Sequence, residues 1–260
     1  MGLPPSFCFF TTASLDPRDT IIVFAKLPVP VKVKTRLLGP LTAEEAAELH
    51  LACLRDTIAL VNSLPSCRKW LMPAGNPSEC LQLAGFLALP ARWRVTPQRG
   101  HELGTRLSQA FLDAFRSGAR SVVVIGTDTP WMGRPRLRQA FEALSRAEVV
   151  IGPAADGGYY LIGARRHAPM LFKGIPWGTG GVLHATLLAI GKARVRYRQL
   201  RRDFDLDRPQ DLERLGDLLR DSDCDAPELG KWLGRRNTTG ESSRRPTLSR
   251  PRRKQRTYPE

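Results

Sequence analysis

Two aspartates follow apolar runs that have the composition of buried strands. Asp128 comes after SVVVIG and Asp156 after EVVIGP, and Lys26 follows TIIVFA in the same way. Ligands of parallel sheets bind beyond the carboxyl ends of the strands, where loops and helix N-termini converge. We therefore expect these three side chains to face one cleft and predict catalytic roles for Asp128 and Asp156. Two structural interpretations stay open, because Asp128 could cap the next helix and Asp156 could serve a turn at Gly157 and Gly158.

The loop after the first apolar run is basic and offers four cations within eleven positions, namely Lys26, Lys32, Lys34 and Arg36. Lys supplies a mobile point charge and Arg a planar pair of donors, so such a cluster suits a pyrophosphate group. A solvated basic loop is the alternative interpretation. The chain has neither G-x-x-x-x-G-K-[ST] nor G-x-G-x-x-G, so a P-loop and a dinucleotide fingerprint are excluded.

Carboxylates that face a phosphate-binding loop would repel the ligand unless a divalent cation lay between them. Mg²⁺ and Mn²⁺ take one or two carboxylates together with phosphate oxygens and water. Asp128 is the main candidate ligand. The segment DFDLD adds aspartates at positions 203, 205 and 207, which an extended backbone would place on one side. We keep Asp205 as a second metal candidate, and the alternative is a turn in which Asp207 caps a helix that begins at Pro209.

Further candidates lie beside these segments. Gly157 and Gly158 permit a turn with positive φ or a close approach of a ligand. Of Tyr159 and Tyr160 only one can face the cleft, because a strand alternates its faces. Trp177 could stack on a sugar ring or pack in the core. The four histidines show no ligand spacing and no G-x-S-x-G occurs, so a serine-hydrolase site has no support.

Strand-like and helix-like patterns alternate along the chain. Thr42 and Glu45 form a capping box at the start of a helix whose apolar face includes Leu51 and Leu54, whereas the three prolines of residues 26–40 argue against a regular element there. Predicted strands are 20–25, 67–73, 92–97, 121–126, 148–153, 159–164 and 193–200; further predicted helices are 77–87, 101–118, 134–146, 181–190 and 209–219. This order predicts a three-layer α/β fold with a mostly parallel sheet covered on both faces.

Charge is unevenly distributed over the 260 residues, which are 42% hydrophobic and carry a net charge of +15. Residues 231–260 hold ten Lys and Arg against two Glu, a net charge of +8, with few large apolar residues. We predict a flexible leader (1–19), one folded domain (20–230) and a disordered basic tail (231–260). The simpler interpretation of the tail is a solvated appendage, and the alternative is electrostatic contact with nucleic acid or anionic lipid.

The five cysteines are scattered and show no C-x-x-C pair, so neither a zinc site nor a disulfide framework is indicated. The N-terminal residues lack the basic start and the apolar run of a signal peptide, and nowhere do about 18 apolar residues occur together. We therefore expect a cytoplasmic protein without a membrane span.

Six segments resemble, in this order, a known family: IVFAKLPVPVKVKTRL, ELGTRL, GTDTP, GPAADGGYYLIG, IPW and DFDLDRPQDL. The family is that of the GT-A-like nucleotide-diphospho-sugar transferases, which includes arsenosugar-biosynthesis-type glycosyltransferases. The resemblance spans residues 20–215 and extends in fold to molybdenum cofactor guanylyltransferase and 2-phospholactate guanylyltransferase. It implies a GT-A-like fold and an activated sugar nucleotide as donor.

The same resemblance implies roles for single residues. It places a metal at Asp128 and an acceptor or sugar side along Gly157, Gly158, Tyr159 and Trp177. Phosphate or nucleotide contacts are expected from four cations: Lys26, Lys34, Arg36 and Arg106. The chain departs from the family at Val31, where Gly is common and would let backbone amides approach a phosphate. It departs again at Ala155, which replaces a common Glu, and in the glycine-rich WGTGG of residues 177–181.

Together these observations predict a metal-dependent glycosyltransferase that uses Mg²⁺ or Mn²⁺, a nucleotide-diphosphate sugar and a small-molecule acceptor. One alternative is a guanylyltransferase-like nucleotidyltransferase that releases pyrophosphate. The other is a catalytically weakened nucleotide-binding protein whose basic tail binds nucleic acid or a partner.

Overall fold

A single seven-stranded sheet organises the protein. The computed structural model describes residues 15–220 and 225–242. The strand order is β3-β2-β1-β4-β6-β5-β7, and all neighbours are parallel except β6, which runs antiparallel to both β4 and β5. The strands are β1 (Asp19–Lys26), β2 (Arg68–Ala74), β3 (Trp93–Val95), β4 (Ser121–Ile125), β5 (Val149–Pro153), β6 (Tyr159–Ala164) and β7 (Tyr197–Gln199). The predicted mostly parallel sheet is confirmed.

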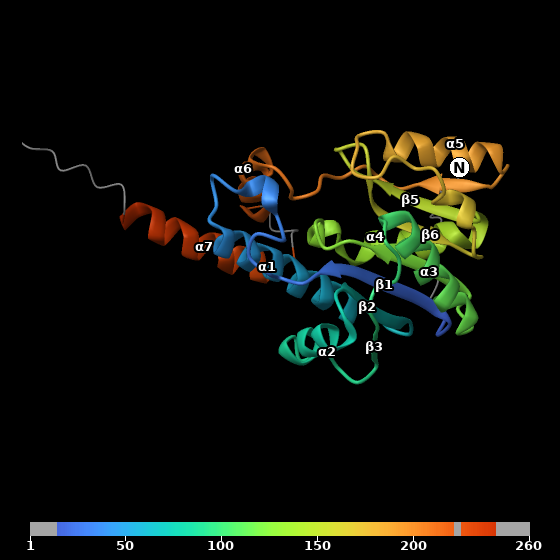
Figure 1. Cartoon of the computed structure of the whole chain (residues 1–260), viewed down its shortest axis with the longest axis horizontal. Helices are drawn as coiled ribbons and strands as arrows, with labels where there is room; N and C mark the ends of the chain where they lie inside the picture. Colours follow the sequence, from blue (N-terminus) through green and yellow to red (C-terminus); the bar gives the residue numbers. More distant parts are fainter. Residues whose placement is uncertain (1–14, 221–224, 243–260) are drawn as a thin grey trace, which may run out of the picture.

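Helices cover both faces of this sheet, as the three-layer prediction requires (Figure 1). On one face α1 (Ala43–Asn62), α2 (Pro77–Phe86) and α4 (Gly133–Arg146) pack over the odd positions of β1, such as Ile21 and Val23. On the other face α3 (Leu103–Arg116) and α5 (Val182–Lys192) pack over Ile22 and Phe24. The central strands β1 and β4 therefore alternate their apolar side chains between two cores, which is why their sequences are mostly apolar.

Helix α1 is buried on two sides, whereas the sequence predicted a single buried face. The capping box of Thr42 and Glu45 is confirmed, with both reciprocal hydrogen bonds present. Leu54 faces the sheet, while Leu51 is only partly buried. The opposite side of α1, which includes Leu49, packs against a further layer made of the 3₁₀ helix η1 (Thr35–Leu37), α6 (Pro209–Arg220) and α7 (Pro227–Ser242).

Helix α7 corrects the predicted start of the disordered tail. The prediction began the tail at residue 231, yet α7 continues to Ser242 and lies along α1 (Figure 1). Trp232 is 3% exposed in this interface, and the Asp56 carboxylate of α1 accepts hydrogen bonds from the backbone N–H groups of Glu228 (3.0 Å) and Leu229 (2.9 Å). The part of the predicted tail after residue 242 lies outside the described residues.

Three smaller predictions also need correction. Strand β1 begins at Asp19, whose buried carboxylate accepts hydrogen bonds from Arg120 (3.0 Å) and Ser121 (2.6 Å). The residues from 15 also belong to the fold, because Leu15 is buried in the core. Residues 1–14 of the predicted leader lie outside the described residues. The loop after β1 contains the short helix η1 despite its prolines, and the strand predicted at 193–200 is shorter because Arg194 takes a positive φ of 52°. No helix among the described residues is long and apolar enough to cross a bilayer.

Candidate active site

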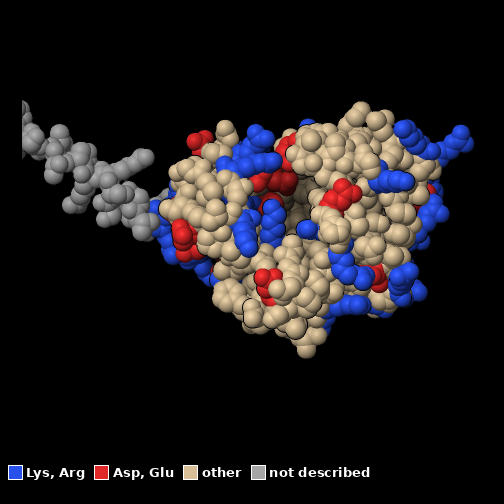
Figure 2. All heavy atoms as spheres, viewed as in Figure 1, with Lys and Arg blue, Asp and Glu red and all other residues tan. Residues whose placement is uncertain are grey.

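A cavity lies at the carboxyl ends of β1 and β4, where the sequence predicted a cleft. Its volume is about 360 Å³, and Figure 2 shows a hollow near the middle of this face with acidic and basic side chains around it. Four predicted residues line this cavity, which we call the central cavity: Lys26, Lys34, Arg106 and Asp128. They come from β1, the loop after it, α3 and the loop after β4. The parallel arrangement thus unites side chains that are about a hundred residues apart.

Lys34 and Asp128 form an ion pair at the base of this cavity. The Lys34 ammonium also donates to the carbonyl of Leu206, and the side chain of Lys34 is 2% exposed against 45% for that of Asp128. Burial is the largest single effect and disfavours the charge on Lys34, but Asp128 and further nearby groups together raise the pKa of Lys34. Burial likewise opposes ionisation of Asp128, yet the charge and hydrogen bond of Lys34 lower the pKa of Asp128. The pair is therefore charged near neutral pH, and Asp128 caps no helix.

This geometry gives Lys34 a role in positioning Asp128, beside the phosphate contact that the resemblance implies. Its backbone is left-handed, with φ 50° and ψ 34°, and this conformation turns the side chain inward at the start of η1. The backbone N–H of Leu206 in turn donates to the carbonyl of Asp128 at 2.9 Å. Lys34, Asp128 and the DFDLD segment are therefore held together by a closed set of hydrogen bonds.

His50 is a residue of the site that the sequence reasoning missed. It lies on α1, is 4% exposed and lines the central cavity. Its Nε2 lies 3.1 Å from the carbonyl of Lys26, which can only accept, so Nε2 carries the proton. Burial lowers the pKa of His50, so the ring is neutral. Its place on a helix of apolar periodicity gave no signal that would separate it from a core histidine.

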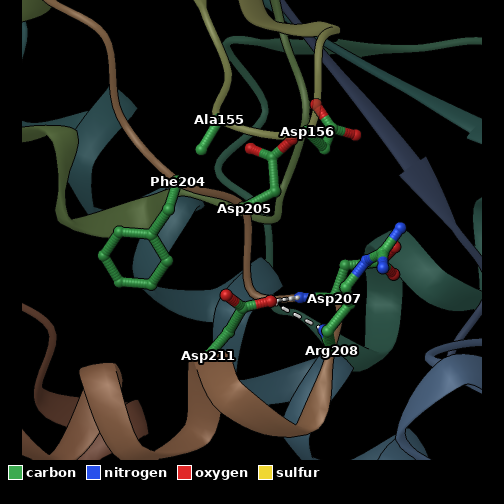
Figure 3. Close-up of a pocket in the computed structure, with 7 residues that line it drawn as sticks. All are labelled: Ala155, Asp156, Phe204, Asp205, Asp207, Arg208 and Asp211. Atoms are coloured by element: carbon green, nitrogen blue, oxygen red, sulfur yellow. Dashed lines mark hydrogen bonds between the residues drawn. The ribbon is translucent and has the colours of Figure 1, made fainter. Parts of the chain in front are cut away.

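A second pocket of about 310 Å³ adjoins the central cavity at Asp207, which lines both (Figure 3). We call it the acidic pocket, because Asp156, Asp205, Asp207 and Asp211 line it with Ala155, Phe204 and Arg208. Asp205 accepts a 2.7 Å hydrogen bond from the hydroxyl of Thr129. Burial, followed by the charges of Asp128 and Asp156, raises the pKa of Asp205 to about 7. The carboxylates of Asp128, Asp156 and Asp205 therefore act on one another although they belong to three separate loops.

The structure separates the aspartates of DFDLD, which were predicted on one side. Asp203 turns to Arg136 at 2.7 Å and does not line the two cavities above. Asp207 forms an ion pair with Arg36 at 2.6 Å, so the predicted phosphate ligand Arg36 is bound at the rim. Asp207 caps no helix through its side chain. Asp211 instead accepts from the backbone N–H groups ahead of α6, as the dashed lines of Figure 3 show.

The DGG turn has both a structural and a site role. The Asp156 carboxylate accepts from the N–H of Gly158 at 2.8 Å, as in the turn interpretation, and Asp156 also lines the acidic pocket. Gly157 has φ 90°, and a Cβ there would lie 2.1 Å from the carbonyl oxygen of Gly180. The second glycine-rich segment, WGTGG, is thus packed directly on the turn. The absence of a Cβ at Gly157 permits this contact.

Tyr159 and Trp177 contact each other rather than the two cavities above. Their rings meet edge to face with centroids 6.3 Å apart, and Trp177 packs on α3, where a Cβ at Gly104 would lie 2.5 Å from its Nε1 atom. Any larger residue in place of Gly104, the glycine of ELGTRL, would therefore clash with the indole of Trp177. Sugar stacking by Trp177 stays a prediction, and the packing interpretation has geometric support.

The residues predicted as metal ligands permit a limited fit. No group of three or more His, Cys, Asp or Glu side chains in the described residues has metal-binding geometry. Asp128 and Asp205 supply two carboxylates, the number that Mg²⁺ takes when phosphate oxygens and water complete its shell. Burial, followed by the charges of Asp128 and Asp156, disfavours the charged form of Asp205, and a bound cation would favour it. The donor set fits a divalent cation that arrives with a phosphate ligand.

Comparisons with known proteins agree with this fold. Residues 57–179 match the family model described as "Uncharacterized protein conserved in bacteria (DUF2064)". A "putative nucleotide-diphospho-sugar transferase" from Desulfovibrio desulfuricans G20 is 29% identical, with a TM-score of 0.78 over 86% of this chain and 97% of its own. No curated protein matches the sequence.

Two more distant structures share the fold alone. The 4-diphosphocytidyl-2C-methyl-D-erythritol synthase of Anaerococcus prevotii DSM 20548 is 9% identical, with a TM-score of 0.53 over 78% of this chain and 96% of its own. A homologue of a Mycobacterium tuberculosis protein from Mycobacterium sp. strain JC1 is 18% identical, with a TM-score of 0.51 over 79% and 99%. The chain therefore has the α/β fold of nucleotide-diphospho-sugar transferase structures, with its charged cavity at the carboxyl edge of the sheet.

Proposed function

We propose that the protein transfers a glycosyl group from a nucleotide-diphosphate sugar to a small acceptor. The observation that carries this proposal is the central cavity, in which Lys26 and Arg106 lie opposite Asp128 at the carboxyl edge of the sheet. The similarity to the transferase from Desulfovibrio desulfuricans G20 supports it. A diphosphate needs cations that reach it, and the exposed Lys26 and the half-buried Arg106 supply them without losing another ion pair.

Helix α3 adds to the phosphate side of the cavity. Its first residue, Leu103, and Arg106 one turn later both line the cavity, and its N-terminus has no side-chain cap. The uncapped N–H groups and the helix dipole favour an anion there. Arg106 is held in place because its Nε donates to the carbonyl of Gly100 at 2.9 Å, which leaves its terminal nitrogens for a ligand.

The transfer step balances as a substitution at the anomeric carbon. The acceptor hydroxyl oxygen forms a bond to that carbon, and the bond from the carbon to the β-phosphate oxygen breaks. The nucleoside diphosphate leaves with the electron pair, and the acceptor proton passes to a carboxylate. Asp156, which the sequence predicts to be catalytic, is exposed in the acidic pocket that adjoins the central cavity, and it takes this role in our proposal.

A divalent cation completes the proposed site. Asp128 and Asp205 would hold Mg²⁺ or Mn²⁺, and the cation would offset the negative charge that collects on the departing diphosphate. Lys34 favours the ionised form of Asp128 and holds its carboxylate in place.

Calorimetric titration tests this function. Nucleotide sugars and nucleoside triphosphates are titrated with and without Mn²⁺ into the wild type, Arg106→Gln and Arg116→Gln. Arg116 is exposed at the far end of the same helix and serves as the control. We expect one sugar nucleotide to bind, with affinity reduced about 10- to 100-fold in Arg106→Gln, since a charge-assisted hydrogen bond is worth about 1.5–3 kcal/mol.

Product analysis separates the proposed function from its nearest rival. Release of a nucleoside diphosphate from the bound sugar nucleotide supports glycosyl transfer, whereas release of pyrophosphate from a triphosphate would reassign the protein as a nucleotidyltransferase. If no nucleotide binds the folded wild type, the enzyme hypothesis fails. Removal of residues 243–260 then tests the predicted binding role of the tail and leaves the docked part of α7 intact.

A further inference from the structure

An apolar pocket opens beside the central cavity on the α3 face of the sheet. Its volume is about 130 Å³, and it shares Phe24, Leu103 and Gly126 with the central cavity. The rest of its wall comes from α3, β4 and β6: Leu107, Val124, Ile125, Tyr159, Tyr160, Leu161 and Ile162. A molecule bound among Lys26, Arg106 and Asp128 would therefore have this apolar pocket as its immediate neighbour.

The side chains that form the wall are almost entirely hydrocarbon. The only side-chain polar atoms are two hydroxyls, and both are directed elsewhere. The hydroxyl of Tyr160 donates to the carbonyl of Arg201 at 2.9 Å, and that of Tyr159 lies beside Thr186 of α5. A sugar ring or a nucleobase would leave its hydrogen-bonding groups unpaired here, which is costly. The pocket thus suits an aryl or compact alkyl group.

Leu103 stands at the mouth shared by the two cavities. It is 44% exposed, although it is a large apolar residue beside a charged cavity. An apolar group entering the pocket would cover Leu103 and remove its surface from water. Apolar cavities of about 150 Å³ lined by Leu, Ile and Phe bind benzene, so the size found here corresponds to roughly one small ring.

The central cavity and the apolar pocket lie at different strands along the edge of the sheet. The sheet runs β3-β2-β1-β4-β6, with Gln98 and Ala74 of the central cavity near the β3 and β2 side and Lys26 at the end of β1. The apolar pocket lies at β4 and β6 instead. If a donor whose phosphates contact Lys26 and Arg106 extends its base toward Gln98 and Ala74, the apolar pocket at β4 and β6 stays open for a second substrate.

We propose that the acceptor is a hydroxyl compound whose apolar part, an aryl ring or a branched alkyl group of about benzene size, occupies this pocket. This proposal rests on the proposed glycosyl transfer and specifies the acceptor class for it. The acceptor hydroxyl would then lie at the shared mouth near Leu103, next to the donor in the central cavity.

Benzyl alcohol is the probe for this acceptor pocket, with glycerol as the polar control. Saturation-transfer NMR measures its binding to the wild type, to Leu107→Phe and to Leu112→Phe. Leu107→Phe fills the pocket from within, and Leu112 lies on the same helix outside it. We expect binding to the wild type and Leu112→Phe, and a loss of at least tenfold in Leu107→Phe. Leu103→Ser, at an exposed position that the fold tolerates, should weaken binding about fivefold.

The sugar nucleotide identified by calorimetry is then titrated in the presence of saturating benzyl alcohol. An unchanged donor affinity, with transfer to benzyl alcohol at least tenfold more efficient than to glycerol, supports the proposal. Competition between the two would place the pocket in the donor site and overturn it. Equal binding of benzyl alcohol to the wild type and to both Leu107→Phe and Leu103→Ser would also overturn it. Failure of the proposed function is read separately, as the absence of any donor binding.

Discussion

Val31 has a backbone conformation that disfavours its own side chain, and replacing it should stabilise the protein. Its φ is 66°, in the left-handed region, and its side chain is 64% exposed. A β-branched residue is rarely found there because its Cβ substituents crowd the backbone. Glycine has no such restriction, and little packing would be lost with an exposed side chain. We therefore expect Val31→Gly to increase the free energy of unfolding.

The magnitude follows from two opposing effects. A non-glycine residue in the left-handed region costs about 1–3 kcal/mol, which the substitution would remove. Glycine gives the unfolded chain more conformational freedom, which costs about 0.5–1 kcal/mol. The net gain is about 1 kcal/mol, or an increase in Tm of about 2–4 °C for a protein of this size.

Val29→Gly in the same loop is the matched control. Val29 is 37% exposed and has no positive φ, so its substitution adds the entropy cost without relieving strain. We expect it to lower Tm by about 2–4 °C. Calorimetry at several scan rates, together with urea unfolding, measures both variants. Equal losses of stability in Val31→Gly and Val29→Gly would show that the left-handed conformation carries no cost, and the reasoning would fail.

Three further predictions concern the site and the α1–α7 contact. Lys34→Met should lower Tm by about 5–10 °C, because Asp128 loses its buried partner. The control Lys32→Met, on the exposed part of the same loop, should change Tm little. Similar Tm values for the two variants would contradict a stabilising role of the Lys34–Asp128 ion pair. Gly157→Ala should cost at least about 2 kcal/mol in urea unfolding, through its contact with the Gly180 carbonyl, and Gly158→Ala clearly less. Burial raises the pKa of Asp56 above 3.8 in the folded state, so the folded protein binds a proton there more tightly than the unfolded chain does. The free energy of unfolding of the wild type should therefore decrease, relative to that of Asp56→Asn, as pH rises from 3.8 through the raised pKa. An increase over pH 4–7 would contradict this sign.

The sheet and most of its helices were predictable because their signals are local. The strand run SVVVIG and the capping box of Thr42 and Glu45 each depend on a few consecutive residues, and both are confirmed. Helix α7 carried a similar signal that charge obscured. Leu229, Trp232 and Leu233 have helical spacing, but Trp232 and Leu233 fall within the basic segment 231–260 that the prediction assigns to the tail.

The site could be predicted only as a set of residues, because its pairings depend on distant segments. Of the three side chains expected to face one cleft, Lys26 and Asp128 line the central cavity, whereas Asp156 lines the adjoining acidic pocket. The sequence could not show that Lys34 is buried, since this depends on the carbonyl of Leu206, which lies 172 positions later. For Asp203 the sequence pattern was misleading. The alternation in DFDLD predicted Asp203 on the same side as Asp205, but its carboxylate is directed to Arg136.

The closed set of hydrogen bonds around Lys34 has a consequence for synthesis on the ribosome. Lys34 emerges long before Leu206, and Asp56 long before Leu229, with separations of 172 and 173 positions. At about 5–20 residues per second, a nascent chain waits roughly 10–30 s before these partners exist. During that interval α1 lacks the helices that cover its outer side. The segment from Leu206 to Leu229 therefore completes both the site and the core, and chains stalled before it would expose apolar surface that chaperones and proteases recognise.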